Sequence, residues 1–204
     1  MMSKADLYLD MVNICSYWPV NATIPCEEFL ARLKVGEADI LDYPFLTMKQ
    51  FQSFKLTLEA EKFLPSIPLL TIPQPMAPDL LQMNKPDRNS LVIVSGNSRL
   101  TIEVLATIWA QGVTSAYFLI VDCLGNTVDM AMVYGEFTPE KLLRVLKKSS
   151  LGEKVEHRNM IVPGSTSPLV RDFGRATNWD IEVGPVCAAE LPLFLGDRWV
   201  FTDL

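Results

Sequence analysis

Short apolar runs alternate with segments of helical periodicity from Ser90 onward, and this alternation limits the possible folds more than any other feature. Strands are predicted at residues 91–94, a continuous β-branched run, and at residues 117–121, 159–162 and 180–183. The segments between them predict helices over residues 100–111, from Thr138-Pro139 onward and over residues 168–177. Parallel strands need long right-handed crossovers. We therefore predict an α/β fold, with a three-layer, Rossmann-like, mostly parallel sheet flanked by helices.

Two further elements are predicted from shorter patterns. Residues 127–134 are expected to run back as a hairpin partner of the second strand. Residues 188–195 are expected to form a short apolar helix that contains a proline.

Six of the chain's 14 prolines lie within residues 64–88, at positions 65, 68, 73, 75, 78 and 86. Proline fixes φ and removes a backbone donor, so this stretch is predicted to be an extended connector and neither a helix nor an inner strand. The residues before it follow a helical pattern. We therefore expect a small helical N-terminal domain (1–63), a connector (64–88) and an α/β domain (89–204).

The charge balance and the N-terminal residues exclude several classes of protein. The chain has 18 Lys and Arg against 24 Asp and Glu, a net charge of −6, so it lacks the basic footprint that nucleic-acid binding requires. The first residues have no apolar signal core, and the longest charge-free stretch is interrupted by Gln111-Gly112. We therefore expect a cytoplasmic protein that contacts neither nucleic acid nor membrane.

The numbers of histidines and cysteines exclude most common enzyme chemistries. The one histidine, His157, rules out sites that need two imidazoles, and no Gly-x-Ser-x-Gly, Gly-x-Gly-x-x-Gly or phosphate-binding loop is present. The four cysteines (15, 26, 123 and 187) form no Cys-x-x-Cys pair, and disulfides have little reason to persist in a cytoplasmic chain. We predict no catalytic residues, no metal-binding residues and no disulfide, but a protein that holds a ligand with its own reactivity.

Segments rich in small residues follow each of the four predicted parallel strands, and ligands of such sheets bind outside the carboxyl ends of the strands. Small residues let backbone amides approach a large flat ligand, although the same residues are typical of ordinary turns and helix caps. The candidate ligand-binding residues are Ser95, Gly96, Asn97, Ser98, Asp122, Gly125, Thr127, Pro163, Gly164, Ser165, Gly184 and Pro185.

The same segments carry a resemblance that spans about residues 90–196. The motifs occur in one order: Ser95-Gly96-Asn97, Asp122-x-x-Gly125, His157-Arg158-x-x-Ile161-Val162-Pro163-Gly164, Trp179-x-x-x-Val183-Gly184-Pro185 and Leu191-Pro192-x-Phe194-Leu195. Together they resemble the C-terminal corrinoid-binding domain of the large (gamma) subunit of the corrinoid iron–sulfur protein, in the acetyl-CoA decarbonylase/synthase system.

The N-terminal part resembles the second half of that family's small four-iron cluster domain. The matching residues are Ile24-Pro25-Cys26, Phe29, Val35-Gly36-Glu37-Ala38 and Asp42-Tyr43-Pro44-Phe45-Leu46. The family pattern Cys-x2-Cys-x4-Cys-x16-Cys, counted from Cys26, puts the other ligands at Trp18, Asn21 and Tyr43, none of which supplies a thiolate. The resemblance implies that the cluster is lost, that the small fold is retained and that the family's central barrel is absent.

The resemblance also implies a cofactor and partners. The cofactor would be a cobalamin-type corrinoid in the base-off state, with no protein histidine on cobalt, because the Asp-x-His-x-x-Gly pattern of histidine-ligated corrinoid proteins is missing. The protein would carry methyl groups or handle corrinoid for a partner methyltransferase or corrinoid-protein subunit, with a homo-oligomer as a further assembly. The alternative is a degenerate, non-binding paralogue that acts as a protein-interaction module. A small-molecule enzyme of flavodoxin-like shape is supported by no motif.

Overall fold

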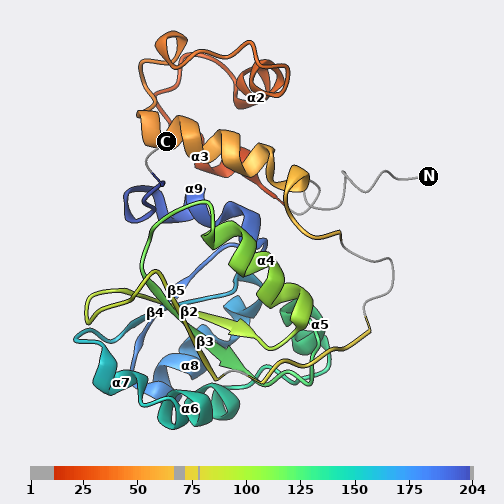
Figure 1. The fold of residues 1–204 in the computed structure, drawn as a ribbon, viewed down its shortest axis with the longest axis vertical. Helices are drawn as coiled ribbons and strands as arrows, with labels where there is room; N and C mark the ends of the chain where they lie inside the picture. The colour runs from red at the N-terminus through yellow and green to blue at the C-terminus, as the bar shows by residue number, and fades with distance from the viewer. Residues whose placement is uncertain (1–11, 67–71, 78, 203–204) are drawn as a thin grey trace.

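A computed structural model describes residues 12–66, 72–77 and 79–202 (Figure 1). Its centre is a five-stranded sheet in the order β1-β3-β2-β4-β5. The strands are β1 (Leu80–Met83), β2 (Leu91–Gly96), β3 (Ala116–Val121), β4 (Asn159–Val162) and β5 (Asp180–Val183). β1 pairs with β3 in antiparallel fashion, and the other three pairings are parallel. The predicted α/β class, with most strands parallel, is therefore confirmed.

Helices cover both faces of the sheet, which explains why the central strands are continuous apolar runs. Successive side chains of a strand point to opposite faces. Ile93 of β2 therefore packs with α4 (Arg99–Trp109) and α9 (Leu191–Leu195), whereas its neighbour Val94 faces the other side. The helices on that other side are α5 (Val128–Val133), α6 (Pro139–Lys148), α7 (Leu151–Lys154) and α8 (Val170–Thr177). Within the described residues, no helix has the length and apolar character needed to cross a membrane.

The helix predicted from Thr138-Pro139 is confirmed as α6. Thr138 is the N-cap, and its hydroxyl accepts a hydrogen bond from the backbone N–H of Lys141 at 3.3 Å. Pro139 occupies the first helical position, where its missing N–H does no harm.

Removal of this cap is expected to cost a modest amount of stability. Thr138→Ala leaves a backbone N–H of the first turn without its side-chain partner, which costs about 1 kcal/mol. The melting temperature measured by circular dichroism should fall by about 2–4 °C. Thr138→Ser keeps the hydroxyl and should stay close to the wild type; equal losses in both variants would contradict the cap.

The predicted hairpin partner at residues 127–134 is wrong, because this segment forms the short helix α5. Val128, Met130 and Met132 alternate in the sequence as they would in a strand. The side chains that are buried are instead Val128 and Ala131, which lie three residues apart on one helix face. Thr127 takes the N-cap position in an extended conformation.

The connector ends in a strand that its prolines did not predict. β1 lies at the edge of the sheet and pairs with β3 from Leu80↔Leu119 to Met83↔Ala116. Edge strands tolerate flanking prolines because one side of the strand needs no partner. Pro68 and Pro78 lie outside the described residues.

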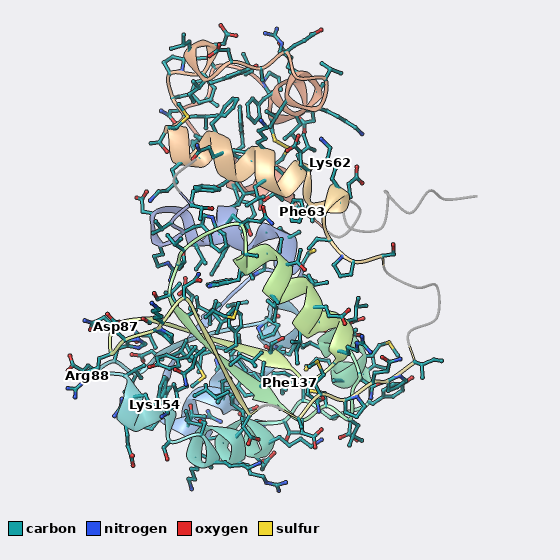
Figure 2. The ribbon with its side chains drawn as sticks, in the orientation of Figure 1. Lys62, Phe63, Asp87, Arg88, Phe137 and Lys154 are labelled. Carbon is teal, nitrogen blue, oxygen red and sulfur yellow. A yellow bond between two sulfur atoms is a disulfide. The ribbon has the colours of Figure 1, made fainter. Side chains whose placement is uncertain are left out.

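The described N-terminal residues form two helices and three single turns around a small aromatic cluster. The helices are α2 (Cys26–Lys34) and α3 (Met48–Leu58), and the 3-10 turns are η1 (Ile14–Tyr17), η2 (Ile40–Asp42) and η3 (Ala60–Lys62). This N-terminal unit lies against α9 at one end of the molecule (Figure 1). Phe63 packs against the cluster that contains α4 and α9, and Figure 2 shows it where the unit meets the rest of the chain.

The expectation that the chain has no disulfide is wrong, because Cys15 and Cys26 form one, with their Cα atoms 5.7 Å apart. The two residues are separated by 11 positions and belong to no recognisable motif. Only the packing of η1 against the start of α2 brings them together. Cys123 and Cys187 are free and buried, as expected for small apolar residues.

Candidate ligand-binding site at the carboxyl edge of the sheet

The order of the strands creates a crevice between β2 and β4. In the sheet, β3 lies on one side of β2 and β4 lies on the other side. The connection from β2 to β3 and the connection from β3 to β4 therefore run in opposite directions across the sheet. A single registered pair, Ile93↔Ile161, joins β2 to β4, whereas six pairs join β2 to β3. Open α/β sheets bind their ligands at such a point, outside the carboxyl ends of the strands.

An apolar hollow of about 240 Å³ opens at this crevice. Its floor comes from Ile93 and Ile161 of the two diverging strands. One wall is α4, through Thr101, Val104 and Leu105, and the opposite wall is the segment from Gly184 to Leu191. The helix face that closes the hollow is the one whose apolar spacing predicted α4.

Six of the twelve candidate residues line this hollow. They come from the end of β2, from the segments that follow β4 and β5, and from the residue that caps α5. They are Ser95, Thr127, Pro163, Ser165, Gly184 and Pro185. Three of these residues, Ser95, Thr127 and Ser165, carry hydroxyl groups in a lining that is otherwise mostly apolar.

Asn97 is held by the protein itself and does not line the hollow. Its Oδ1 accepts hydrogen bonds from the backbone N–H groups of Cys123 at 2.8 Å and Gly125 at 3.0 Å. Its Nδ2 donates to Asp122 at 2.9 Å and to the carbonyl of Met76 at 3.3 Å. These four bonds use all the hydrogen-bonding capacity of the side chain. Asn97, Asp122 and Gly125 therefore lock two corners of the sheet together.

A strap from the connector lies over these corners. The strap consists of residues 74–76. The N–H of Gln74 donates a hydrogen bond to the carbonyl of Gly125 at 3.3 Å, and the N–H of Met76 donates one to the carbonyl of Asn97 at 2.8 Å. Gly125 has a φ of 80°, and a Cβ there would lie 2.4 Å from the nitrogen of Pro75. Pro75 also forms a β-bridge with Ser98. The strap thus occupies the space beside Ser98 and Gly125.

Gly96 and Gly164 serve close packing between the corners. A Cβ at Gly164 would lie 2.8 Å from the carbonyl oxygen of Gly184 and from the backbone nitrogen of Val186. The N–H of Gly164 donates to the Pro185 carbonyl at 2.9 Å, which joins the ends of β4 and β5. A Cβ at Gly96 would approach Val128 at 3.2 Å. These two glycines position the wall of the hollow and do not line it.

A second, polar hollow of about 490 Å³ lies between the strap and α6. Asn97 and Asp122 border it, together with Lys141, Arg144 and Lys148 of α6. Lys148 is paired with Asp79 at 2.7 Å. Eight of the twelve candidate residues therefore line one of two hollows, whereas Gly96, Ser98, Gly125 and Gly164 line neither.

Other lining residues were not singled out from the sequence: Thr101 lies in the first turn of α4, and Val186 and Cys187 follow directly after Gly184-Pro185. The thiol of Cys187 is no nucleophile at neutral pH, because burial raises its pKa to about 11. Asp129 is the one charged residue among those that line the apolar hollow in the described part of the chain. The lining of the hollow is therefore mostly apolar.

His157 lies at the other edge of the sheet. Its Nε2 is 2.9 Å from the carbonyl oxygen of Ser90, just before β2 begins, and its Nδ1 accepts from the N–H of Asn159. Its ring lies 6.5 Å from that of Trp179. The histidine thus holds loops at the amino ends of the strands, far from the hollow along the sheet.

In the N-terminal unit, aromatic rings occupy two of the three positions that the resemblance aligns with cluster ligands. Trp18 and Tyr43 each pack on Phe29, with ring centroids 4.8 Å apart in both pairs. Cys26 is engaged in the disulfide. Across the described residues, no three His, Cys, Asp or Glu side chains are grouped so that they could hold a metal ion.

The size of the apolar hollow limits what it can hold. An apolar cavity of about 150 Å³ takes one benzene ring, so 240 Å³ suits a group of two fused rings. Pockets that enclose a drug-sized ligand measure about 300–1,000 Å³. A large ligand would therefore fit inside this volume only in part.

One known family matches more than half of the chain. Its model, described as CO dehydrogenase/acetyl-CoA synthase delta subunit, matches residues 56–195. The match contains the whole sheet, α4 and both walls of the apolar hollow.

Curated relatives match over a similar region. The chain is 34% identical, over 123 residues, to the acetyl-CoA decarbonylase/synthase complex subunit gamma of Methanopyrus kandleri, covering 60% of this chain and 27% of the relative. It is 32% identical, over 108 residues, to the corrinoid/iron-sulfur protein large subunit of Moorella thermoacetica, covering 53% and 24%. The subunit gamma of Methanocaldococcus jannaschii is 27% identical over 127 residues, covering 62% and 26%. The chain spans about a quarter of the length of these relatives.

Proposed function

The chain belongs to the CO dehydrogenase/acetyl-CoA synthase delta subunit family, and on that premise we propose that it binds a cobalamin-type corrinoid. It would carry a methyl group on that cofactor or hold the cofactor for a partner methyltransferase. The observation that carries the proposal is the mostly apolar hollow at the crevice between β2 and β4, whose lining includes hydroxyl-bearing residues. When bound, the corrinoid supplies the methyl-transfer chemistry through its cobalt.

The residues of the hollow fit one part of such a cofactor. A base-off corrinoid has a detached two-ring base, and a space of 240 Å³ with apolar walls suits a group of that size and character. The hydroxyl groups of Ser95, Thr127 and Ser165 would bond polar groups of the cofactor at the border of the hollow. The corrin ring itself would lie outside the hollow.

The position of His157 supports a corrinoid without a protein ligand on cobalt. The histidine is bonded at the amino edge of the sheet, whereas the hollow opens at the carboxyl edge. The aromatic packing of Trp18 and Tyr43 and the disulfide of Cys26 support a protein that has no four-iron cluster. Both features are part of the proposal.

A partner subunit is also part of this proposal. The relatives from Methanopyrus kandleri and Methanocaldococcus jannaschii are subunits of the acetyl-CoA decarbonylase/synthase complex, and a ring that lies outside the hollow would leave one side open to another protein. The partner would be a methyltransferase or a corrinoid-protein subunit, and a second copy of the chain is the other option. The domain division at residues 63 and 88 remains a prediction.

A binding experiment tests the proposed function. The full chain, mixed with hydroxocobalamin at micromolar concentration, should change the visible spectrum of the corrinoid. After gel filtration the protein should contain cobalt in stoichiometric amount and no iron or sulfide. A stoichiometric iron–sulfur cluster would contradict the proposed loss of the cluster.

The alternative function is a protein-interaction module that no longer binds corrinoid. It is favoured by the small volume of the apolar hollow and by the internal bonds that occupy Asn97, Asp122 and Gly125. No spectral change and no retained cobalt at micromolar protein would contradict corrinoid binding and favour this alternative.

A further inference from the structure

The disulfide of the N-terminal unit joins two segments that differ in accessibility. Cys15 lies in η1 and is partly exposed, whereas Cys26 is the first residue of α2 and only 5% exposed. A thiolate from solution therefore reaches the sulfur of Cys15 first, and the sulfur of Cys26 is the leaving group.

Opposing electrostatic effects act on the sulfur of Cys26 at the start of α2. The backbone N–H groups at the start of a helix carry partial positive charge and stabilise a thiolate there. Glu27 and Glu28 follow in the same turn, and the pairing of Glu28 with Arg32 at 2.7 Å offsets part of their opposing charge. Because Cys26 is only 5% exposed, its burial opposes the charged form, and the opening of the bond depends on the access of the reductant to Cys15.

η1 holds the N-terminal unit against the segment that builds one wall of the apolar hollow. Ile14 is buried in the aromatic cluster that also contains Leu193 of α9. The hydroxyl of Tyr17 and the N–H of Asn13 donate hydrogen bonds to the carboxylate of Glu190. Glu190 is 5% exposed and ends η5 (Ala188–Glu190), directly before α9. The buried carboxylate therefore depends on η1 for its hydrogen-bond partners.

We propose that the Cys15–Cys26 disulfide is a reversible thiol–disulfide clasp, which a dithiol reductant opens to release η1 from α2 and from α9. In the first step a reductant thiolate attacks the Cys15 sulfur, the Cys15–Cys26 bond breaks, and Cys26 leaves as a thiolate that takes up a proton. In the second step the other thiol of the reductant attacks the mixed disulfide and frees Cys15 as a thiol. Two electrons and two protons pass from the dithiol, which becomes a disulfide.

The other two cysteines provide an internal control. Burial raises the pKa of the Cys123 thiol to about 12 and that of Cys187 to about 11. Both thiols are therefore protonated and shielded at neutral pH, and alkylating reagents should label neither in the folded protein. Labelling of Cys15 and Cys26 consequently reports on the clasp alone.

The test uses the full chain, treated with increasing dithiothreitol, alkylated with iodoacetamide under native conditions and analysed by peptide mass spectrometry. Labels are expected on Cys15 and Cys26 together, at reductant concentrations that leave Cys123 and Cys187 unlabelled. Limited chymotrypsin digestion of the reduced protein should then cut near Tyr17 and Trp18, while residues 90–195 stay intact. The melting temperature should fall by about 5–10 °C.

Variants separate the clasp from unrelated effects of the reductant. Cys15→Ser/Cys26→Ser should reproduce the digestion pattern of the reduced protein and should no longer respond to dithiothreitol. Tyr17→Phe keeps the disulfide and should give an intermediate digestion rate. If the double variant does not fold, the reduced wild type still decides the result. Three outcomes would each overturn the proposal. The protein could show four alkylatable thiols without reductant, Cys15 and Cys26 could be labelled only when the whole protein unfolds, or the disulfide could be reduced without any change in the digestion pattern.

Discussion

Thr101→Trp is expected to weaken the binding of hydroxocobalamin by about 10- to 100-fold. Thr101 stands in the first turn of α4 and lines the apolar hollow. An indole at this position would fill much of the 240 Å³ and exclude the flat group that the hollow is proposed to hold. Burying an apolar group of Phe size contributes about 1.5–3 kcal/mol. Each 1.4 kcal/mol corresponds to about a factor of ten in affinity.

Ala106→Trp is the matched control for this variant. Ala106 lies on the exposed face of the same helix and does not line the hollow. The affinity of this control, measured by spectral titration, should equal that of the wild type, and both variants should keep the melting temperature within a few degrees. If Thr101→Trp bound hydroxocobalamin as tightly as Ala106→Trp does, the hollow would not be the site.

Asn97→Ala is expected to destabilise the fold by about 3–4 kcal/mol. The substitution leaves the N–H groups of Cys123 and Gly125 buried without their acceptor, and each buried unsatisfied group costs about 1–3 kcal/mol. Asp122 and the carbonyl of Met76 lose a donor at the same time. Chemical denaturation followed by circular dichroism measures the loss, and a fall of about 6–16 °C in melting temperature should accompany it.

Two variants make this prediction specific. Asn89→Ala changes an exposed asparagine outside the corner and should alter stability by less than about 0.5 kcal/mol. Asn97→Asp keeps the accepting oxygens but places a second carboxylate beside Asp122, where like charges repel. The loss of stability in Asn97→Asp should become smaller as the pH falls, because a protonated carboxyl group at position 97 can again donate a hydrogen bond to Asp122. A loss below about 1 kcal/mol for Asn97→Ala would contradict the role of Asn97 as the lock between corners.

The central strands β2 and β3 were predictable because each contains a continuous apolar run, whereas β5 alternates polar and apolar residues. All six residues of β3 are buried, and a strand covered on both faces has no polar side to interrupt the run. α6 was predictable from its local cap and its apolar spacing. These elements depend on neighbours in the sequence, so a linear pattern suffices to find them.

β1 and α5 were not predicted as they occur, for two different reasons. β1 is a short edge strand of four residues in a proline-rich stretch, and its pairing with β3 is decided by residues far along the chain. α5 has only six residues, and over so short a segment an alternating pattern and a helical pattern look alike.

The candidate site lies at the predicted edge of the sheet, but the sequence could not distinguish the residues that line a hollow from those that are bonded within the protein. Ser95 and Asn97 are two positions apart, yet Ser95 lines the apolar hollow and Asn97 is bonded within the protein. The partners of Asn97 come from the next strand's loop and from the strap at Met76. No local pattern carries the information that these segments meet.

Linear patterns were enough to establish the succession of parallel strands and major helices. They also located the edge where four turns gather, because parallel strands joined by crossovers must place their carboxyl ends together. Only the folded chain shows which turns face a hollow, which are sealed by the strap and which cysteines are joined. Those outcomes depend on hydrogen bonds, side-chain packing and a disulfide between segments distant in sequence, and such contacts exist only once the chain has folded.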